Sequence, residues 1–594
     1  MTAPHEPATP ERNTAMGSQR TTSITARVTT LTLVCALAAA LAACGGGGGS
    51  TPSSNAAKST PTSSGVPVVA ADGKLHAACQ GCSATDDSTY AGSGAGIWQA
   101  INANASAIDV PVSIKGLSGQ NVTLVFTNES ASTQAMSSIS LSANMSASIM
   151  RAQSQAAATS STTGSESPTL AAIRDFNYRG WTSLATDPQT TATARYSTNG
   201  TTASALYSVA TWQIGDTRTF YYVDHSLRTT TLAQTATTSD GTTVNLWVES
   251  GELGASKISP QIISSLITQY AQAGGIYDML VRVGGKLYGP NSQSSLIDGT
   301  HQPIDLVVMN FDNNGQPYGL LGYFYGLNNF KKGAGDLAYS NESISLYLDS
   351  ETLYLGGTYG MNQMLTTMAH ESMHMQNFYR RPVLMGSQYA FEPWLEEMTA
   401  MMMEDWASSE IVPGYNAIRD ARFVTYMTYA GHGSYNCGLT TWTPYGTDCE
   451  SYAVNGSFGG FLNRQLGLSF YQSLLNNKNH TASLDILNEV IGNARASATV
   501  PSMLRDFAAA ASGLIPLASN VTGFTFPARS ESGFALPAID PTSLYNGATR
   551  YLPTSVPSTL AVLGTFPVVR SHVSGTYGET VHVPVGTTLS VVVD

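Results

Sequence analysis

The residues HESMH, from His370 to His374, constrain this chain more than any other stretch. On a helix, His370 and His374 lie four residues apart on one face, and at this spacing two imidazoles can bind one Zn²⁺ ion. Glu371 lies beside the pair but rotated away from it, as expected of a general base. The segment predicts a helix with one buried face, because apolar residues recur in it at helical spacing: Met361, Met364, Leu365 and Met368.

A hydrolytic zinc site needs a third protein ligand, and Glu397 is the best candidate. It follows His374 after 22 residues, enough for one helix to end, a loop to turn at Arg381-Pro382 and a second helix to return antiparallel. Glu396 is the alternative ligand. Glu404 lies two helical turns beyond Glu397, where it is expected to accept a hydrogen bond from the far nitrogen of a ligating histidine.

These two motifs carry a resemblance to a known family. The residues TMAHESMHMQNFYRR and WLEEMTAMMMED resemble the hyicolysin family of secreted bacterial metallopeptidases, a branch of the thermolysin-like zincins that use two histidines and a glutamate. In the wider group the second motif often reads WLNEG, and its acidic position corresponds to Glu397. The chain departs from that pattern at Glu396, where Asn is usual, and at Met398, where Gly is usual.

The resemblance covers roughly residues 220–590 and implies a zincin-like catalytic domain. Relatives often place a tyrosine or histidine after the glutamate ligand, where it stabilises the anionic transition state. Tyr452 is the first candidate for this donor, and His432 and Tyr445 are the alternatives.

The charge balance bears on the kind of partner. The formal net charge is −12, and only 11% of the residues are charged. No basic stripe is present, so nucleic acid is excluded as a partner.

The first residues predict export. Arg20 and Arg27 precede an apolar run from Val28 to Ala43, and the residues Leu41-Ala42-Ala43-Cys44 resemble the lipobox of bacterial lipoproteins. We therefore expect residues 1–43 to be a signal segment and the mature protein to be lipid-anchored at Cys44, on a bacterial membrane or cell surface. The alternative is an ordinary signal peptide with an unmodified cysteine. Residues 44–75 are rich in Gly, Ser, Thr and Pro and predict a tether.

Four further cysteines suggest disulfides in an exported protein. The local pairings are Cys79 with Cys82 and Cys437 with Cys449. Cys79 and Cys82 also form a CxxC motif, but no βαβ unit supports redox activity there.

The rest of the sequence predicts an α+β multidomain protein. Residues 76–250 alternate in β fashion and form either an accessory module or a pro-segment that covers the cleft, with a long loop or insertion around 130–168. Residues 251–518 form the catalytic domain, with a mixed sheet and helices. Residues 519–594 form a small C-terminal β-sandwich.

Several elements of the catalytic domain are predicted individually. Ser259-Pro260 begins a helix that runs to Tyr270. Strands are expected at 304–309 and 343–349, and the second is expected to be the edge that pairs with an extended substrate. Helices are expected at 457–475 and 482–494.

Two possible ion sites are weaker. The turn Asn310–Gly315 resembles the start of a calcium loop, but Leu321 stands where the loop needs a glutamate, so a plain turn is favoured over Ca²⁺. A cluster of methionines is interpreted as core packing and not as a copper site, since no Cys or His joins it: Met398, Met401, Met402 and Met403.

Together these features predict a zinc-dependent endopeptidase that acts on extracellular or envelope proteins. An exopeptidase is a variant of this hypothesis, although no motif for binding a free terminus is visible. The alternative from another class is a surface lipoprotein or adhesin that carries a non-catalytic zinc site.

Overall fold

A computed structural model describes residues 67–136, 138–141, 167–186, 212–519, 521–543 and 550–594. All of them belong to one compact unit, Pro61–Asp594. The expected signal segment and Cys44 lie outside the described residues, as does most of the expected insertion at 130–168. Within the described part of the chain, every helix is too short or too polar to cross a lipid bilayer.

The first of two large sheets is mixed and has the strand order β11-β12-β10-β9-β8-β7. Strands β9, β10 and β12 are parallel, whereas β7, β8 and β11 are antiparallel to their neighbours. We call it the catalytic sheet, after the predicted catalytic domain in which three of its strands, β10, β11 and β12, lie. Its strands are β7 (Thr217–Tyr221), β8 (Leu227–Thr237), β9 (Thr243–Glu249), β10 (Ile304–Met309), β11 (Gly322–Phe324) and β12 (Ile344–Asp349).

Both faces of the catalytic sheet are covered, because its central strands are apolar on both sides. Leu246, Leu306 and Leu346 pack into the main core, on the side of helices α4 (Pro260–Ala271), α5 (Ile276–Gly284) and α7 (Gly357–Phe378). Trp247 and Tyr347 point to the other side, into a smaller aromatic cluster. Ser259 caps α4 through its side chain, as predicted.

The edge strand of this sheet differs from the prediction. Strand β12 pairs with β10 on one side and with β11 on the other, so the segment 343–349 is internal. The edge strand is β11, which has three residues and runs antiparallel to β12. The prediction of β12 as the edge strand was therefore wrong. Strand β11 was overlooked, because three residues show too little alternation of apolar and polar side chains for a strand to be recognised.

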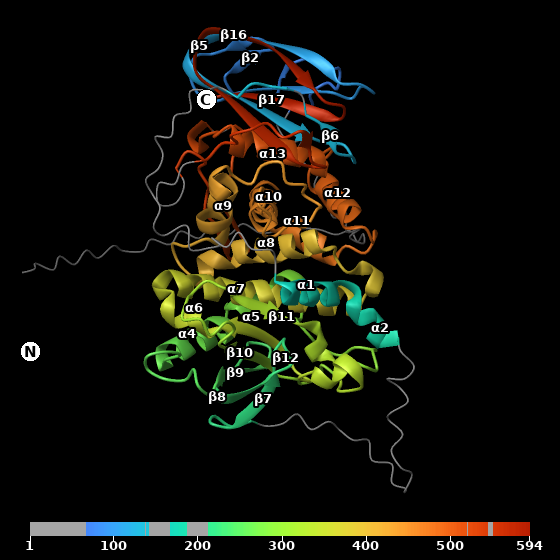
Figure 1. The fold of residues 1–594 in the computed structure, drawn as a ribbon, viewed down its shortest axis with the longest axis vertical. Helices are drawn as coiled ribbons and strands as arrows, with labels where there is room; N and C mark the ends of the chain where they lie inside the picture. The colour runs from blue at the N-terminus through green and yellow to red at the C-terminus, as the bar shows by residue number, and fades with distance from the viewer. Residues whose placement is uncertain (1–66, 137, 142–166, 187–211, 520, 544–549) are drawn as a thin grey trace, which may run out of the picture. The chain divides into compact units, whose positions relative to one another are not determined.

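The second large sheet joins the two ends of the described chain. Strand β5 (Ile108–Asn128) pairs with both β16 (Thr565–Val583) and β17 (Thr587–Val593), and β17 also pairs with β4 (Gly96–Ile101). Figure 1 shows these blue and red strands interleaved. We call it the terminal sheet. Its remaining strands are β1 (His76–Ala77), β2 (Ala84–Asp86) and β3 (Thr89–Tyr90).

Each of the two sheets contains strands from more than one of the domains predicted from the sequence. Strands β7 to β9 lie before residue 250, yet they belong to the catalytic sheet. The C-terminal strands do not form a separate small sandwich, because they complete a sheet with residues 76–128. Between these parts, residues 168–186 form α1 (Pro168–Asp175), the π-helical segment η2 (Phe176–Gly180) and α2 (Trp181–Thr186).

Helix α7 is followed by the turn that leads to α8 (Pro393–Ile411). Pro382 lacks an N–H group, and the chain passes it in a wider π-helical turn, η5 (Tyr379–Val383). Arg381 in this turn is fully buried, and its Nη1 donates to the carbonyl oxygens of Leu475 and Asn477, each at 2.9 Å. This contact fixes the turn, and with it the position of α8 against α7.

The remaining helices pack behind α8 and fix it in place. Arg464 of α10 (Ser451–Leu466) and Asp405 of α8 form a fully buried ion pair, with Nη1 to Oδ2 at 2.7 Å. The expected helix 457–475 is two helices, because Gly467 adopts a φ of +85° that ends α10 before α11 (Leu468–Asn476). The other helices are α6 (Ser350–Leu355), α9 (Phe423–Thr428), α12 (Ser483–Ala494) and α13 (Val500–Ser512).

Both predicted disulfides, Cys79–Cys82 and Cys437–Cys449, are confirmed. The methionine cluster is fully buried, as expected of core packing.

Candidate active site

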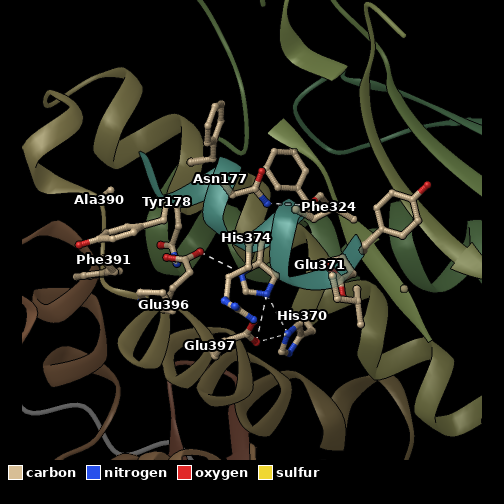
Figure 2. A pocket seen from close by; sticks show the side chains of 18 of the residues that line it. Asn177, Tyr178, Phe324, His370, Glu371, His374, Ala390, Phe391, Glu396 and Glu397 are labelled. Atoms are coloured by element: carbon tan, nitrogen blue, oxygen red, sulfur yellow. Dashed lines mark hydrogen bonds and ion pairs between the residues drawn. The ribbon is translucent and has the colours of Figure 1, made fainter. Parts of the chain in front are cut away.

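Helices α7 and α8 bring together the three predicted metal ligands (Figure 2). His370 Nε2 and His374 Nε2 lie 3.0 Å apart, and Glu397 Oε2 lies 3.3 Å and 3.6 Å from them. His370 and Glu397 are buried, and the His374 side chain is only 13% exposed. Among the described residues, this is the one group of three or more His, Cys, Asp or Glu side chains placed to hold a metal ion.

These distances fit a zinc ion. Zinc binds imidazole nitrogen and carboxylate oxygen at about 2.0–2.2 Å, so tetrahedral ligand atoms lie roughly 3.3–3.5 Å apart. The three observed separations, 3.0, 3.3 and 3.6 Å, bracket that range. Glu397 Oε2 is also buried without a hydrogen bond of ordinary geometry. A cation at this point would satisfy that oxygen.

Each imidazole has its own carboxylate on the far nitrogen. His370 Nδ1 lies 2.7 Å from Glu404 Oε1, and His374 Nδ1 lies 3.0 Å from Glu396 Oε1. A carboxylate at Nδ1 holds the proton there and leaves the Nε2 lone pair free to bind a metal. Glu404 therefore lies where the sequence placed it. Glu396, weighed as an alternative ligand, instead lies beside Nδ1, away from the three ligand atoms.

The carboxylates dominate the electrostatics of the cluster. Although burial disfavours the charged imidazoles, Glu404 and Glu397 raise the pKa of His370 to about 9. Burial is likewise outweighed at His374, where Glu397 and Glu396 raise the pKa well above its usual value. Burial opposes ionisation of Glu397 too, but the two imidazoles lower the pKa of this carboxyl. The cluster therefore favours positive charge, which a divalent cation supplies.

Arg422 contacts Glu404, the carboxylate that faces His370. Its Nη2 donates to Glu404 Oε1 at 3.4 Å, and its guanidinium carbon lies 5.2 Å from the centre of the Tyr452 ring. Burial alone would raise the pKa of Glu404, but Arg422 and His370 lower it, so this carboxylate stays ionised beside His370. Arg422 thereby connects Glu404 to a tyrosine of the cleft wall.

Glu371 is buried in the same cleft, and both imidazoles lie close enough to affect its ionisation. Burial raises the pKa of Glu371, and the neighbouring His370 and His374 oppose that rise. A carboxylate with a raised pKa is a stronger base toward a bound water.

The cleft is lined by the three ligands and Glu371. Tyr452 and Tyr445 both line it, with ring centres 6.1 Å apart. His432, the third candidate donor, is not among the lining residues, and its Nδ1 lies 2.8 Å from the carbonyl oxygen of Gly433. The structure thus brings two of the three candidate donors to the cleft.

The segment Asn310–Gly315 forms a turn built on a carboxylate. Glu351 accepts hydrogen bonds from the backbone N–H groups of Asn314 and Gly315, at 3.2 Å and 3.0 Å. Its oxygens are thereby used within the protein, and the residues of this turn do not belong to the metal-ligating group found in the described chain. The segment is therefore a turn closed by hydrogen bonds to the carboxylate of Glu351.

Three features of the site were missed in the sequence. Glu396 was assigned no role in orienting His374, Arg422 was not identified, and the helical segment 168–186 beside the cleft was treated as part of the β-rich region 76–250. The role of Glu396 could have been suspected, because a glutamate stands there in place of the Asn that is usual in the wider group. Arg422 meets the site only through tertiary packing, and nothing in its local sequence marks it. For residues 168–186 the available signal was Ser167 followed by Pro168, which caps and begins α1 as Ser259-Pro260 does α4.

Comparison with known proteins adds two matches. The family model described as Peptidase M30 matches residues 224–594, more than half of the chain. A model for a domain of unknown function (DUF8571) matches residues 77–141. No curated protein matches the chain. The first match includes α7 and α8, and the second covers most of the N-terminal strands of the terminal sheet.

Proposed function

The chain belongs to the Peptidase M30 family, and from this premise we propose that it is a zinc-dependent endopeptidase acting on extracellular or envelope proteins. One observation carries the proposal. The Nε2 atoms of His370 and His374 and Oε2 of Glu397 lie 3.0–3.6 Å from one another in a cleft that also contains Glu371.

His370, His374 and Glu397 would hold the zinc ion. Bound there, zinc supplies Lewis acidity that polarises the peptide carbonyl and makes water easier to deprotonate. Glu371 takes the proton from the attacking water and then delivers it to the nitrogen of the leaving amine. Its burial supports this role, because a desolvated carboxylate holds a proton more readily than an exposed one.

Tyr452 is proposed as the donor that stabilises the negative charge developing on the carbonyl oxygen. Its ring lies against the guanidinium of Arg422 and next to Tyr445, and both tyrosines line the cleft. Tyr445 is the alternative donor. A phenol at either position contributes only if its hydroxyl reaches the oxygen in the transition state.

The proposal is tested by cleavage of casein by the wild-type protein and by Glu371→Gln. We expect internal cuts, seen as fragments by mass spectrometry, and a loss of about 10²–10⁴-fold in rate for Glu371→Gln with zinc retained. Glu410→Gln is the matched control, since Glu410 is exposed at the end of α8. Wild-type activity in Glu371→Gln would contradict the mechanism. Zinc binding without cleavage by either protein would favour the adhesin-like alternative.

The proposal includes export and lipid anchoring at Cys44. The sequence of residues 20–44 supports it. Incorporation of labelled palmitate into the expressed protein, and its loss in Cys44→Ala, is the expected result.

A further inference from the structure

We propose that residues 167–186 are an internal inhibitor that occupies the place of a peptide substrate along strand β11. The inference rests on the proposed peptidase function. This segment lies between the two matched regions, residues 77–141 and 224–594, so neither match assigns it a role.

Among the described strands, β11 pairs with β12 alone, so one of its edges faces the cleft that holds the three candidate metal ligands. Strand β11 is the last strand of the catalytic sheet, and the N–H of Asp349 donates to the carbonyl oxygen of Leu321 at 2.9 Å. Because an antiparallel ladder bonds alternate residues, the polar groups of Gly322 and Phe324 point away from β12. An extended peptide that adds to a sheet edge binds to groups of this kind.

Asn177 of η2 already uses one of these groups, the Phe324 carbonyl, together with the N–H of Gly326 just beyond the end of β11 (Figure 2). Its Nδ2 donates to the carbonyl oxygen of Phe324 at 2.8 Å, and its Oδ1 accepts from the N–H of Gly326 at 2.7 Å. One side-chain amide thus makes the pair of hydrogen bonds, one donated and one accepted, that a residue of an added strand would make. The single N–H of Gly326 cannot serve a substrate at the same time.

The same segment lies along the cleft itself. Arg174, Asn177 and Tyr178 line it together with His374 and Glu371. In Figure 2 Asn177 lies on the teal segment toward Phe324, and Tyr178 lies on the other side, toward Ala390 and Phe391. A peptide bound along β11 and reaching the metal ligands would have to displace these side chains.

Apolar anchors hold the segment in place. Trp181 is 2% exposed, with its ring centre 5.5 Å from that of Phe378 in α7. Phe176 packs edge-on against Tyr325 at 5.2 Å, directly after β11. Ile173 of α1 is buried in the aromatic cluster on the far face of the catalytic sheet. Because the segment is part of the same chain, its effective concentration at the cleft is high, and a free peptide must compete with it.

The test measures binding separately from hydrolysis. In the Glu371→Gln background, fluorescein-labelled casein is titrated by fluorescence anisotropy with and without Asn177→Ala. We expect Asn177→Ala to lower the Kd about tenfold, since two hydrogen bonds that hold the segment on the edge are lost. Asn177→Asp, which keeps the shape but removes the donor to Phe324, should change the Kd in the same direction. Ser183→Ala is the control, because Ser183 is exposed on the same segment and does not line the cleft.

The sign of the change decides the result. A Kd that is unchanged or higher in both Asn177 variants overturns the inference, since the segment would then be no competitor of the substrate, or would be a wall of its site. The same Asn177 variants with Glu371 intact are assayed for casein cleavage, which should rise about tenfold. Tighter binding without cleavage by any variant would refute the proposed peptidase function and leave the inhibitory contact standing.

Discussion

Helices α7 and α8 and the terminal sheet both contribute to the buried core, but different interactions predominate at the metal-ligand cluster and in the sheet. At the metal-ligand cluster, α7 and α8 meet through polar groups, with a carboxylate facing each imidazole: Glu404 faces His370, and Glu396 faces His374. In the terminal sheet the contacts are apolar. Leu124 of β5 lies between Val568 of β16 and Val591 of β17, and none of the three is more than 1% exposed. From this difference we infer that metal binding depends mainly on the cluster between α7 and α8, and that the terminal sheet contributes mainly to the free energy of unfolding.

If the two regions are independent, a substitution in the metal-ligand cluster should leave the fold unchanged, and a substitution in the terminal sheet should leave zinc affinity unchanged. The largest effect is expected for Glu397→Ala, which removes one of three ligands. We expect no zinc to be retained after dialysis and no hydrolysis to be detected, while circular dichroism shows an unchanged fold. Glu410→Gln, exposed on the same helix, should keep both zinc and activity. Stoichiometric zinc in Glu397→Ala would contradict the ligand assignment.

The reverse experiment is Leu124→Ala in the terminal sheet. Truncation of a fully buried leucine should lower the free energy of unfolding by about 2–5 kcal/mol, measured by urea denaturation. Zinc affinity should not change, because Leu124 lies on the terminal sheet and the ligands lie on α7 and α8. Lys115→Ala, exposed on the same strand, is the control with little expected effect. A parallel loss of zinc affinity would show that the two regions are coupled.

A smaller effect is expected for Glu396→Gln. The carboxylate orients His374 and also accepts from Asn377 Nδ2 at 3.0 Å. Its neutralisation should weaken zinc binding about 10–100-fold, as judged by competition with a chelator. Glu404→Gln should act similarly through His370. If zinc affinity matched that of the Glu410→Gln control, these carboxylates would have no part in orienting the ligands.

The smallest effect concerns pH and the helix that packs on the terminal sheet. Burial raises the pKa of Asp506 in α13 to about 6, although Arg505 and Arg495 oppose that rise. A folded-state pKa above the ordinary value means that this carboxyl contributes most stability below about pH 4, and that the contribution is lost as pH rises through 6. Relative to Asp506→Asn, the wild type should lose on the order of 1 kcal/mol over that interval in urea denaturation. Parallel pH profiles would contradict this.

The comparison also explains what the sequence could predict. The motif at His370 to His374, the strands predicted at 304–309 and 343–349, and both disulfides depend on local spacing. The helix, the two strands, with the second beginning at Ile344, and the disulfides are confirmed. Such features can be predicted from periodicity and turn residues, because each feature depends on residues only a few positions apart in the sequence.

The remaining features depend on contacts between distant parts of the chain. Strand β5 near one end pairs with β16 near the other, and no local pattern in either strand identifies its partner. The edge strand β11 has only three residues, and Asn177 meets it from a segment about 147 positions earlier. Residues that serve the site through such contacts, including Arg422, become visible only when the helices are packed.

The central claim is that His370, His374 and Glu397 hold one zinc ion. X-ray absorption at the zinc edge, on protein loaded with one equivalent of zinc, tests it most directly. The account predicts a shell of nitrogen and oxygen ligands at about 2.0–2.2 Å with the signature of two imidazoles, reduced in His374→Ala. Sulfur ligands, or an unchanged imidazole signature in His374→Ala, would contradict it.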